Sequence, residues 1–138
     1  MRPGEKKGII KQLKEFFSKR PKLIRCIIKE WAENPGDIRD LIIILNKIGY
    51  DTNQIGKDLF EEKIREFSEP WDIIWLIDIL NKAGYNVDKI SGQVFEERVR
   101  KINTYWELEL LVDTLEEARY DINQIGKGVI RGSWKRCI

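Results

Sequence analysis

The sequence predicts an all-α fold, a short α-hairpin repeat stack of about eight helices with a 35-residue period. Two observations carry this prediction. Residues 37–71 and 72–106 align without a gap and share 16 identities in 35 positions. Apolar residues recur at the spacing of one helical face, and no alternating run is long enough for a sheet. We therefore expect a single domain (1–138), made of a divergent basic N-terminal hairpin (1–36) and three helical-hairpin repeats (37–71, 72–106 and 107–138).

The N-terminal hairpin is expected to contain two amphipathic helices. The first covers about residues 5–18, and the second lies between Pro21, which interrupts the first pattern, and the turn at 34–36. The apolar stripes are Ile9, Ile10, Leu13, Phe16 and Phe17 in the first helix, and Leu23, Ile24, Ile27, Ile28 and Trp31 in the second.

Each repeat begins with an A helix, and these helices are expected at about 37–48, 71–83 and 105–118. In the first of them apolar residues recur at i, i+3, i+4, i+7 and i+10, and Asp37 stands where an N-cap side chain is expected. Gly49 and Gly84 follow the last apolar residue, where a left-handed glycine ends a helix without strain. Arg119 occupies this place in the third repeat, so it must either tolerate the strain or end its helix differently.

A short polar turn follows each A helix, and a B helix follows the turn. Each turn begins with a tyrosine and has an isoleucine five residues later: Tyr50, Tyr85 and Tyr120, with Ile55, Ile90 and Ile125. We expect each tyrosine to cover a hairpin corner and to find a partner for its hydroxyl, and each isoleucine to fill the inside of the hairpin. The B helices are expected at about 57–67, 91–102 and 126–135, with Pro70 ending the first.

The second A helix is apolar nearly all round, which favours stacking. Neighbouring A helices on both sides and its own B helix would bury such a helix completely. The deepest residues are then expected at Leu41, Ile42, Leu45, Leu76, Ile77, Leu80, Leu111, Val112 and Leu115. A closed helical bundle, in which the two ends meet, is the alternative architecture.

The composition excludes several kinds of functional site. The chain has no histidine, so His-dependent catalytic triads, imidazole metal sites and histidine pH switches are absent. Cys26 and Cys137 lie far apart without a CxxC partner, which predicts free thiols. Since the chain has neither a phosphate-binding glycine motif nor a converging pair of acids, we expect no enzyme, no metal and no cofactor.

The hydropathy and composition bear on location and source. No apolar run reaches the ~18–20 residues that a membrane-spanning helix needs, and the N-terminus lacks a signal-peptide core. We expect a cytoplasmic protein without an integral membrane segment. The few Met and Cys residues, the missing His and the many Lys and Glu residues are typical of a protein from a heat-loving organism.

Part of the second repeat resembles a known repeat family. Residues 76–84 read Leu-Ile-Asp-Ile-Leu-Asn-Lys-Ala-Gly, and residues 94–97 read Val-Phe-Glu-Glu. These segments resemble the two helices of the pentatricopeptide repeat, also a 35-residue hairpin, and tetratricopeptide-type repeats share the general pattern. The resemblance covers residues 37–127 loosely and implies a stack of hairpins.

The chain departs from that family in four ways. Its turn is longer, the small Ala of the second helix is missing, and no Gly-x-x-Pro closes the units. At the position where the family selects an RNA base, often with Asn, this chain has Arg39, Ile74 and Glu109. This set does not resemble a base-reading code, so the resemblance implies the hairpin stack and not the family's usual ligand.

These features favour a non-enzymatic protein-protein interaction module whose partner is another protein or a second copy of the chain. The candidate residues of a partner groove are Trp71, Trp106, Tyr50, Tyr85 and Tyr120. Trp71 and Trp106 are expected at the loops between repeats. For them, packing between hairpins is the competing interpretation, and we favour it because apolar residues that recur in stacked units usually serve a common core.

The distribution of charge predicts an alternative function. Residues 1–30 hold ten Lys and Arg against three acids, residues 31–126 hold eleven against twenty, and residues 127–138 hold four against none. Basic ends could bind nucleic acid by neutralising phosphates. The candidate contacts are Lys6, Lys7, Lys11, Lys14, Lys19, Arg20, Lys22 and Arg25. A third and weaker alternative places the basic amphipathic segment 5–18 on an anionic membrane.

Overall fold

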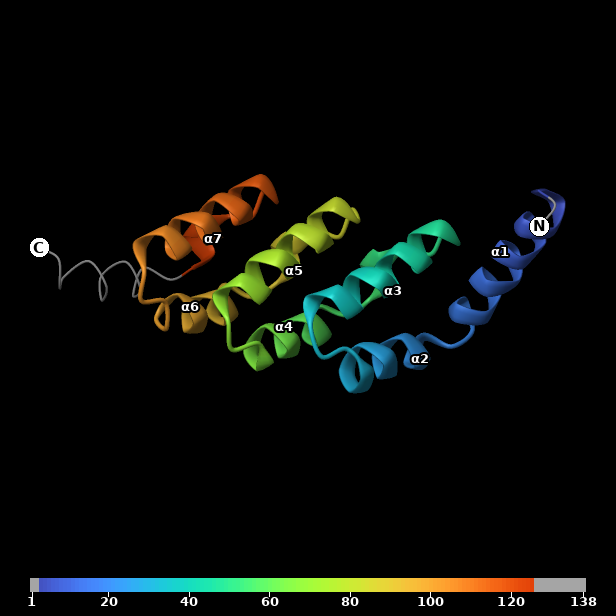
Figure 1. Ribbon diagram of the computed structural model, residues 1–138, viewed down its shortest axis with the longest axis horizontal. Helices are drawn as coiled ribbons and strands as arrows, with labels where there is room; N and C mark the ends of the chain where they lie inside the picture. Colours follow the sequence, from blue (N-terminus) through green and yellow to red (C-terminus); the bar gives the residue numbers. More distant parts are fainter. Residues whose placement is uncertain (1–2, 126–138) are drawn as a thin grey trace, which may run out of the picture.

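The computed structural model describes residues 3–125, and this part of the chain contains seven α-helices and no β-strand (Figure 1). The helix expected at 126–135 lies outside the described residues. The α-helices are α1 Pro3–Ser18, α2 Pro21–Cys26, α3 Pro35–Lys47, α4 Lys57–Glu66, α5 Pro70–Lys82, α6 Gly92–Val99 and α7 Tyr105–Glu117. The π-helical segment η1 (Ile27–Trp31) continues α2, and three short 3-10 turns occur, η2 Thr52–Gln54, η3 Val87–Lys89 and η4 Ile122–Gln124.

The helices form two rows. In the first row α3 packs on α5 and α5 packs on α7, and in the second η1 packs on α4 and α4 packs on α6. Figure 1 shows the rows one above the other, with α1 and α7 at opposite ends of an elongated, open array. Helix α1 packs on α2 and forms one end of the array. The two ends of the described chain therefore do not meet as they would in a closed bundle.

Proline begins α3 and α5, at Pro35 and Pro70, where the missing N–H would have had no helical partner. The N-cap of α3 is Asn34, whose side chain accepts a hydrogen bond of 3.1 Å from the Asp37 N–H. The expectation that Asp37 caps this helix is therefore wrong. Its carboxylate lies inside the first turn and accepts a hydrogen bond of 2.9 Å from the Glu33 N–H. Pro70 likewise begins α5 instead of ending α4, because the fixed φ of proline suits the first turn of a helix.

The first-row helices end in the same way. Gly49 and Gly84 follow α3 and α5 with φ of 78° and 81°, which confirms the left-handed position expected there. Arg119 has φ of 60° after α7. The third helix thus ends with the same backbone geometry, and a residue with a Cβ atom carries the strain.

The core lies between the two rows. Of the nine residues expected to be deepest, eight are buried, and Leu76 and Leu80 of α5 are completely enclosed. Val112 of α7 is only partly buried. In the described part of the chain α7 has a first-row neighbour on one side only, so one of its faces is less covered than those of α5. Helix α5 is buried over most of its circumference, as expected, and its exposed residues are Trp71, Trp75 and Lys82.

Polar side chains join successive turns along one edge of the array. The Asn53 Oδ1 atom accepts a hydrogen bond of 2.8 Å from the Asn86 N–H, and the Asn53 side-chain amide donates one of 3.0 Å to the Gly84 carbonyl. Asp88 occupies the position 35 residues after Asn53, and its Oδ1 atom accepts a hydrogen bond of 3.2 Å from the Asp121 N–H. Each turn is thus tied to the next by a side chain at one repeat position. Among the described residues, no helix has the length and apolar content to cross a membrane.

Candidate functional site

Exposed aromatic side chains gather at the start of α5 and α7. Trp71 and Trp106 are 50% and 51% exposed, and their ring centroids lie 5.2 Å apart at an interplanar angle of 48°. They lie in the first turns of these helices and not in loops, because α5 and α7 begin at Pro70 and Tyr105. The two rings join α5 to α7, as the packing interpretation expects. About half of the surface of each residue is nevertheless exposed to solvent. A structural role alone does not account for that exposure.

Two grooves lie on either side of α5. One groove of about 350 Å³ lies between α3 and α5, and a second of about 380 Å³ lies between α5 and α7. Trp75, which is 42% exposed, and Asp78 line both grooves, and Trp71 and Asp72 line the second. We call the surface formed by Trp71, Trp75, Trp106 and the two grooves the aromatic face. Sequence reasoning missed Trp75 because the matching residue of the first repeat is Asp40, so no recurrence marks it.

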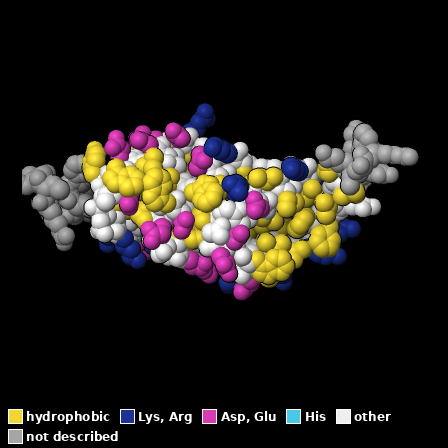
Figure 2. Space-filling view, viewed as in Figure 1, with side chains coloured by type: hydrophobic (Ala, Val, Ile, Leu, Met, Phe, Trp, Pro, Cys, Tyr) yellow, Lys and Arg dark blue, Asp and Glu magenta, His cyan; other side chains and the backbone are white. Residues whose placement is uncertain are grey.

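The two grooves of the aromatic face are lined by charged side chains of both signs: Asp72, Asp78, Arg39 and Lys82. The Arg39 guanidinium lies 5.5 Å from the centre of the Trp75 ring, which shows that this ring accepts a cation. Lys82 pairs with Asp78 at 2.9 Å. Helix α7 carries five acidic and no basic side chains. Figure 2 shows Asp and Glu around the hydrophobic groups over the C-terminal part of the array. The face therefore combines apolar rings with charges of both signs in its grooves, and the acidic helix α7 borders one of these grooves.

The three tyrosines do not belong to this face. Tyr50, Tyr85 and Tyr120 are all buried. The Tyr85 hydroxyl donates to the Ile55 carbonyl at 3.2 Å, and the Tyr120 hydroxyl donates to the Ile90 carbonyl at 2.8 Å. The prediction that these two tyrosines find hydroxyl partners at the hairpin corners is confirmed, and their burial leaves little of either ring exposed to a partner. Burial raises the pKa of Tyr85 and of Tyr120 to about 12, with nearby carboxylates adding to the effect.

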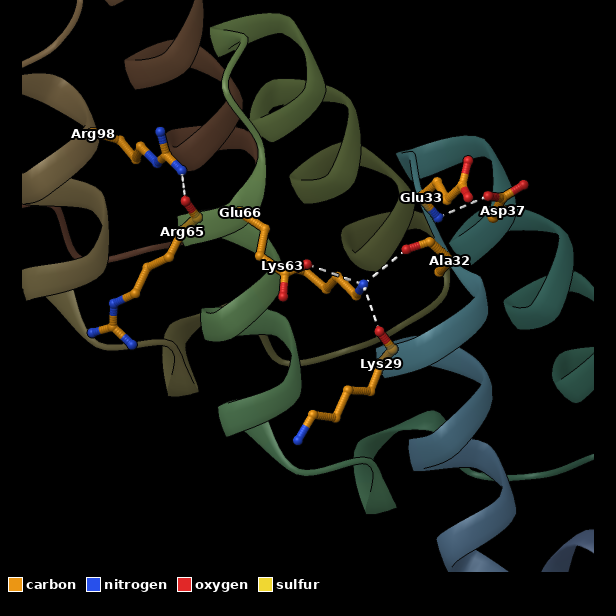
Figure 3. Close-up of polar contacts among 8 residues, drawn as sticks. All are labelled: Lys29, Ala32, Glu33, Asp37, Lys63, Arg65, Glu66 and Arg98. Atoms are coloured by element: carbon orange, nitrogen blue, oxygen red, sulfur yellow. Dashed lines mark hydrogen bonds and ion pairs between the residues drawn. The ribbon is translucent and has the colours of Figure 1, made fainter.

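Two buried cations were also missed from the sequence. The Lys63 amine donates hydrogen bonds of 3.1 and 2.8 Å to the carbonyls of Lys29 and Ala32, at the end of η1 (Figure 3). Arg98 donates a hydrogen bond to the Arg65 carbonyl near the end of α4 (Figure 3). Lys63 and Arg98 stand 35 residues apart, and a basic residue recurring inside an apolar pattern was the available signal. Both cations join one second-row helix to the C-terminal end of the preceding one.

The basic residues of α1 and α2 are not equally free to bind phosphate. Lys11, Lys14, Lys19 and Lys22 are exposed. Arg25 forms a two-pronged contact with Asp58, at 2.7 and 3.3 Å, and this hydrogen-bonded pairing lowers the pKa of the Asp58 carboxyl. The partner of Arg25 is therefore a carboxylate of the chain itself.

Arg20, Lys6 and Lys7 are the remaining candidate nucleic-acid contacts. The Arg20 guanidinium lies 4.2 Å from the centre of the Phe16 ring. Lys6 and Lys7 belong to α1, but their side chains lie outside the described part of the structure. Of the six candidate nucleic-acid contacts whose side chains the structure describes, Lys11, Lys14, Lys19 and Lys22 are exposed with amines that contact neither the Phe16 ring nor Asp58.

Helix α1 also exposes an apolar stripe. Ile9, Leu13 and Phe16 are 42%, 38% and 41% exposed, while Ile10 and Phe17 of the same helix pack against the core. Within the described residues no group of three acidic or cysteine side chains converges to hold a metal ion. The chemistry that the surface offers is apolar contact and charge. Comparison of the chain with protein-family models, curated proteins and solved structures finds no match.

Proposed function

We propose that this chain is a non-enzymatic protein-interaction module, built as a short stack of α-hairpin repeats, and that its aromatic face binds another polypeptide. The exposed cluster of Trp71, Trp75 and Trp106 beside two grooves carries the proposal. Tryptophan is enriched at the energetic centres of protein interfaces, because a large ring buries much apolar area with little loss of side-chain entropy. Placing three such rings on one surface is costly for a protein without a partner.

Contacts that recur at the repeat spacing support the stack. The contact of Tyr85 with Ile55 has its counterpart, 35 residues on, in the contact of Tyr120 with Ile90. An Asx turn recurs in the same way, since Asp51, Asn86 and Asp121 each accept a hydrogen bond from the N–H two residues later. A stack made in this way leaves its outer helix faces open, which is how repeat proteins obtain extended binding surfaces.

The paired acids of the second-row helices support a structural role over a catalytic one. Glu61 accepts a hydrogen bond of 3.2 Å from the Ser91 N–H, at the start of α6. Glu97 pairs with Arg65 at 3.3 Å, and Glu96 pairs with Arg100 at 2.9 Å. These carboxylates join helices or reinforce one helix, so they do not form the converging acid and base that hydrolysis needs.

Affinity capture from the lysate of the native host tests the proposal. The wild-type chain, the Trp75→Ser variant and the matched control Trp31→Ser would serve as baits, each with and without nuclease. Trp31 is 70% exposed and lies outside both grooves. We expect a nuclease-resistant protein to be captured by the wild type and the control but lost with Trp75→Ser. Equal capture by all three baits would place the binding surface elsewhere.

The second candidate function is nucleic-acid binding by the basic end of the array. The exposed Lys11, Lys14, Lys19 and Lys22 favour it, because lysines on adjoining helices can follow a phosphate backbone. The acidic residues over the rest of the surface oppose it. The two functions differ in their response to salt, because only phosphate binding releases many counterions.

A further inference from the structure

Two exposed surfaces of this chain, the apolar stripe of α1 at one end of the array and the aromatic face on α5 and its neighbours, complement each other. We infer that the partner of the aromatic face is a second copy of the chain, whose α1 docks its exposed stripe of Ile9, Leu13 and Phe16 on that face. This inference rests on the proposed function, since it names the polypeptide that occupies the same surface.

The first argument is the shape of α1. Ile9, Leu13 and Phe16 fall at i, i+4 and i+7, so they form one stripe along about two turns of the helix. Ile10 and Phe17 lie roughly a quarter turn away and pack against the core of their own chain. Helix α1 therefore has two apolar faces, one satisfied inside the chain and one without a partner in the described structure. An amphipathic helix presenting such a stripe suits a hydrophobic groove between helices.

The second argument is charge. Residues 1–30 carry ten basic and three acidic side chains, whereas α7 carries five acidic and no basic ones. Figure 2 shows Lys and Arg, with few acids, at the end formed by α1 and α2, and the Asp and Glu residues toward the other end. Arg20 follows Phe16 by four residues, so it lies on the same side of the chain, and its guanidinium lies over the Phe16 ring. Docking of the stripe would therefore bring a cation to the aromatic face as well. Asp72, in the groove between α5 and α7, is an acid that this cation can meet.

The third argument is that the contact must join two chains. Helix α1 and helix α7 lie at opposite ends of the array (Figure 1), so the stripe of one chain does not reach its own aromatic face. Donor and acceptor surfaces differ, which makes the contact directional. Each copy that donates α1 keeps a free aromatic face, and such contacts extend into longer assemblies or close into rings.

The directional geometry allows a complementation experiment. We take Leu13→Asp as the donor-defective variant and Trp75→Ser as the acceptor-defective variant, both at exposed positions, with Trp31→Ser as the control. Sedimentation equilibrium from ~5 to ~200 μM at low salt should give the wild type and the control a mass that rises above the 16.4 kDa monomer. Each defective variant should stay monomeric. An equal mixture of the two should form dimers and nothing larger, because it contains only one intact donor and acceptor pair.

Charge variants provide a second, independent measurement. Asp72→Lys should weaken self-association by about tenfold or more, because it opposes the cation carried by α1. Lys11 lies on the side of α1 opposite the stripe, by the 100° advance per residue of a helix. Lys11→Glu should therefore weaken self-association by no more than about threefold, through long-range charge alone. Circular dichroism of every variant would confirm that the helices are retained.

The outcomes separate this inference from the proposed function. A wild-type chain that stays monomeric throughout, or an association that Leu13→Asp leaves unchanged, overturns the inference. If the lysate experiment still shows capture that depends on Trp75, the proposed function stands and the partner is a different protein. If neither self-association nor Trp75-dependent capture is found, both are wrong. Binding of α1 to nucleic acid or to anionic vesicles by a chain that stays monomeric without them would assign the stripe to that ligand and overturn the inference as well.

Discussion

The ring of Tyr85 lies edge to face against the ring of Phe60, with 4.9 Å between the ring centroids. Tyr120 meets Phe95 in the same way at 5.0 Å. Each phenol therefore sits between an aromatic ring of the preceding second-row helix and the backbone carbonyl that accepts its hydrogen bond. Ionising either phenol would place a negative charge in this apolar setting and would remove the donated hydrogen bond.

This arrangement predicts a loss of stability at high pH. Each hydroxyl has a pKa of about 12 in the folded chain and of 10.0 ordinarily, so between these values the unfolded chain loses the proton and the folded chain keeps it. The contribution of each tyrosine to the free energy of unfolding is complete below pH 10. It should fall by about 1.4 kcal/mol per pH unit as the pH rises toward 12. Denaturant unfolding at pH 9, 10 and 11 would measure this slope.

A matched variant separates the effect of the two tyrosines on the pH dependence of stability from the effect of lysines, which also titrate at high pH. The double variant of Tyr85→Phe and Tyr120→Phe keeps both rings and cannot ionise at these positions. Its free energy of unfolding should be lower near neutral pH, by about 0.5–1.5 kcal/mol for each lost hydrogen bond, and its slope above pH 10 should be shallower. An unchanged slope would show that the two hydroxyls do not titrate differently in the folded chain.

The core of α5 should be the most sensitive to truncation. Leu80→Ala or Leu76→Ala should lower the free energy of unfolding by about 2–5 kcal/mol, through lost apolar contact and the cavity left behind. Ile44→Ala is the control, since Ile44 is 47% exposed, and its effect should be below about 1 kcal/mol. Urea denaturation midpoints decide the result. Losses under about 0.5 kcal/mol at both leucines would contradict the central position of α5.

The helix ends predict opposite effects at equivalent positions. Gly84 has φ of 81° and open space where a Cβ atom would stand, so Gly84→Ala should cost about 1 kcal/mol through backbone strain alone. Arg119→Gly should stabilise the chain by about 0.5–1 kcal/mol, because it relieves that strain at φ of 60°. Thermal melts of both variants beside the wild type would test this. A melting temperature lowered by Arg119→Gly would contradict the role assigned to the left-handed residue.

The buried amine of Lys63 should be needed to join the first two second-row helices. Lys63→Met retains the length and apolar stem of the side chain but leaves the carbonyls of Lys29 and Ala32 without their donor. We expect a loss of about 1–3 kcal/mol, measured by denaturant unfolding. Lys57→Met, at an exposed position of the same helix, is the control and should be nearly neutral. Equal effects of the two substitutions would argue against the capping role.

Salt dependence separates nucleic-acid binding from protein binding. A site that neutralises six or more phosphates should lose several orders of magnitude in affinity between ~50 and ~200 mM monovalent salt. Under the proposed function, anisotropy assays with mixed DNA and RNA at physiological salt should show only weak, non-specific binding. Submicromolar binding at ~150 mM salt, abolished by Lys11→Glu together with Lys14→Glu, would reverse the ranking of the two functions.

The sequence alone determined the helical content and much of the core. The i, i+3, i+4 spacing placed Leu76 and Leu80 inside, and the glycines after two helices marked where these helices end. The period reports which residues share one face of a helix, and a core can be predicted from it when that face is the buried one. Two helix starts were misplaced: Asn34, and not Asp37, caps α3, and Pro70 begins α5, because Asn, Asp and Pro are all common residues at the start of a helix.

The tertiary structure alone decided which repeated residues are available to a partner. Trp71, Trp106 and the tyrosines recur equally well in the sequence, yet the tryptophans are half exposed and the tyrosines are buried. Arg25 is a basic residue like Lys22 until the fold places Asp58 beside it. Periodicity determines on which face of its own helix a side chain lies. Whether that side chain is exposed depends on whether a neighbouring helix packs against that face. In an open array a terminal helix packs against neighbours on one side only. The stripe of α1 therefore remains exposed in the folded chain.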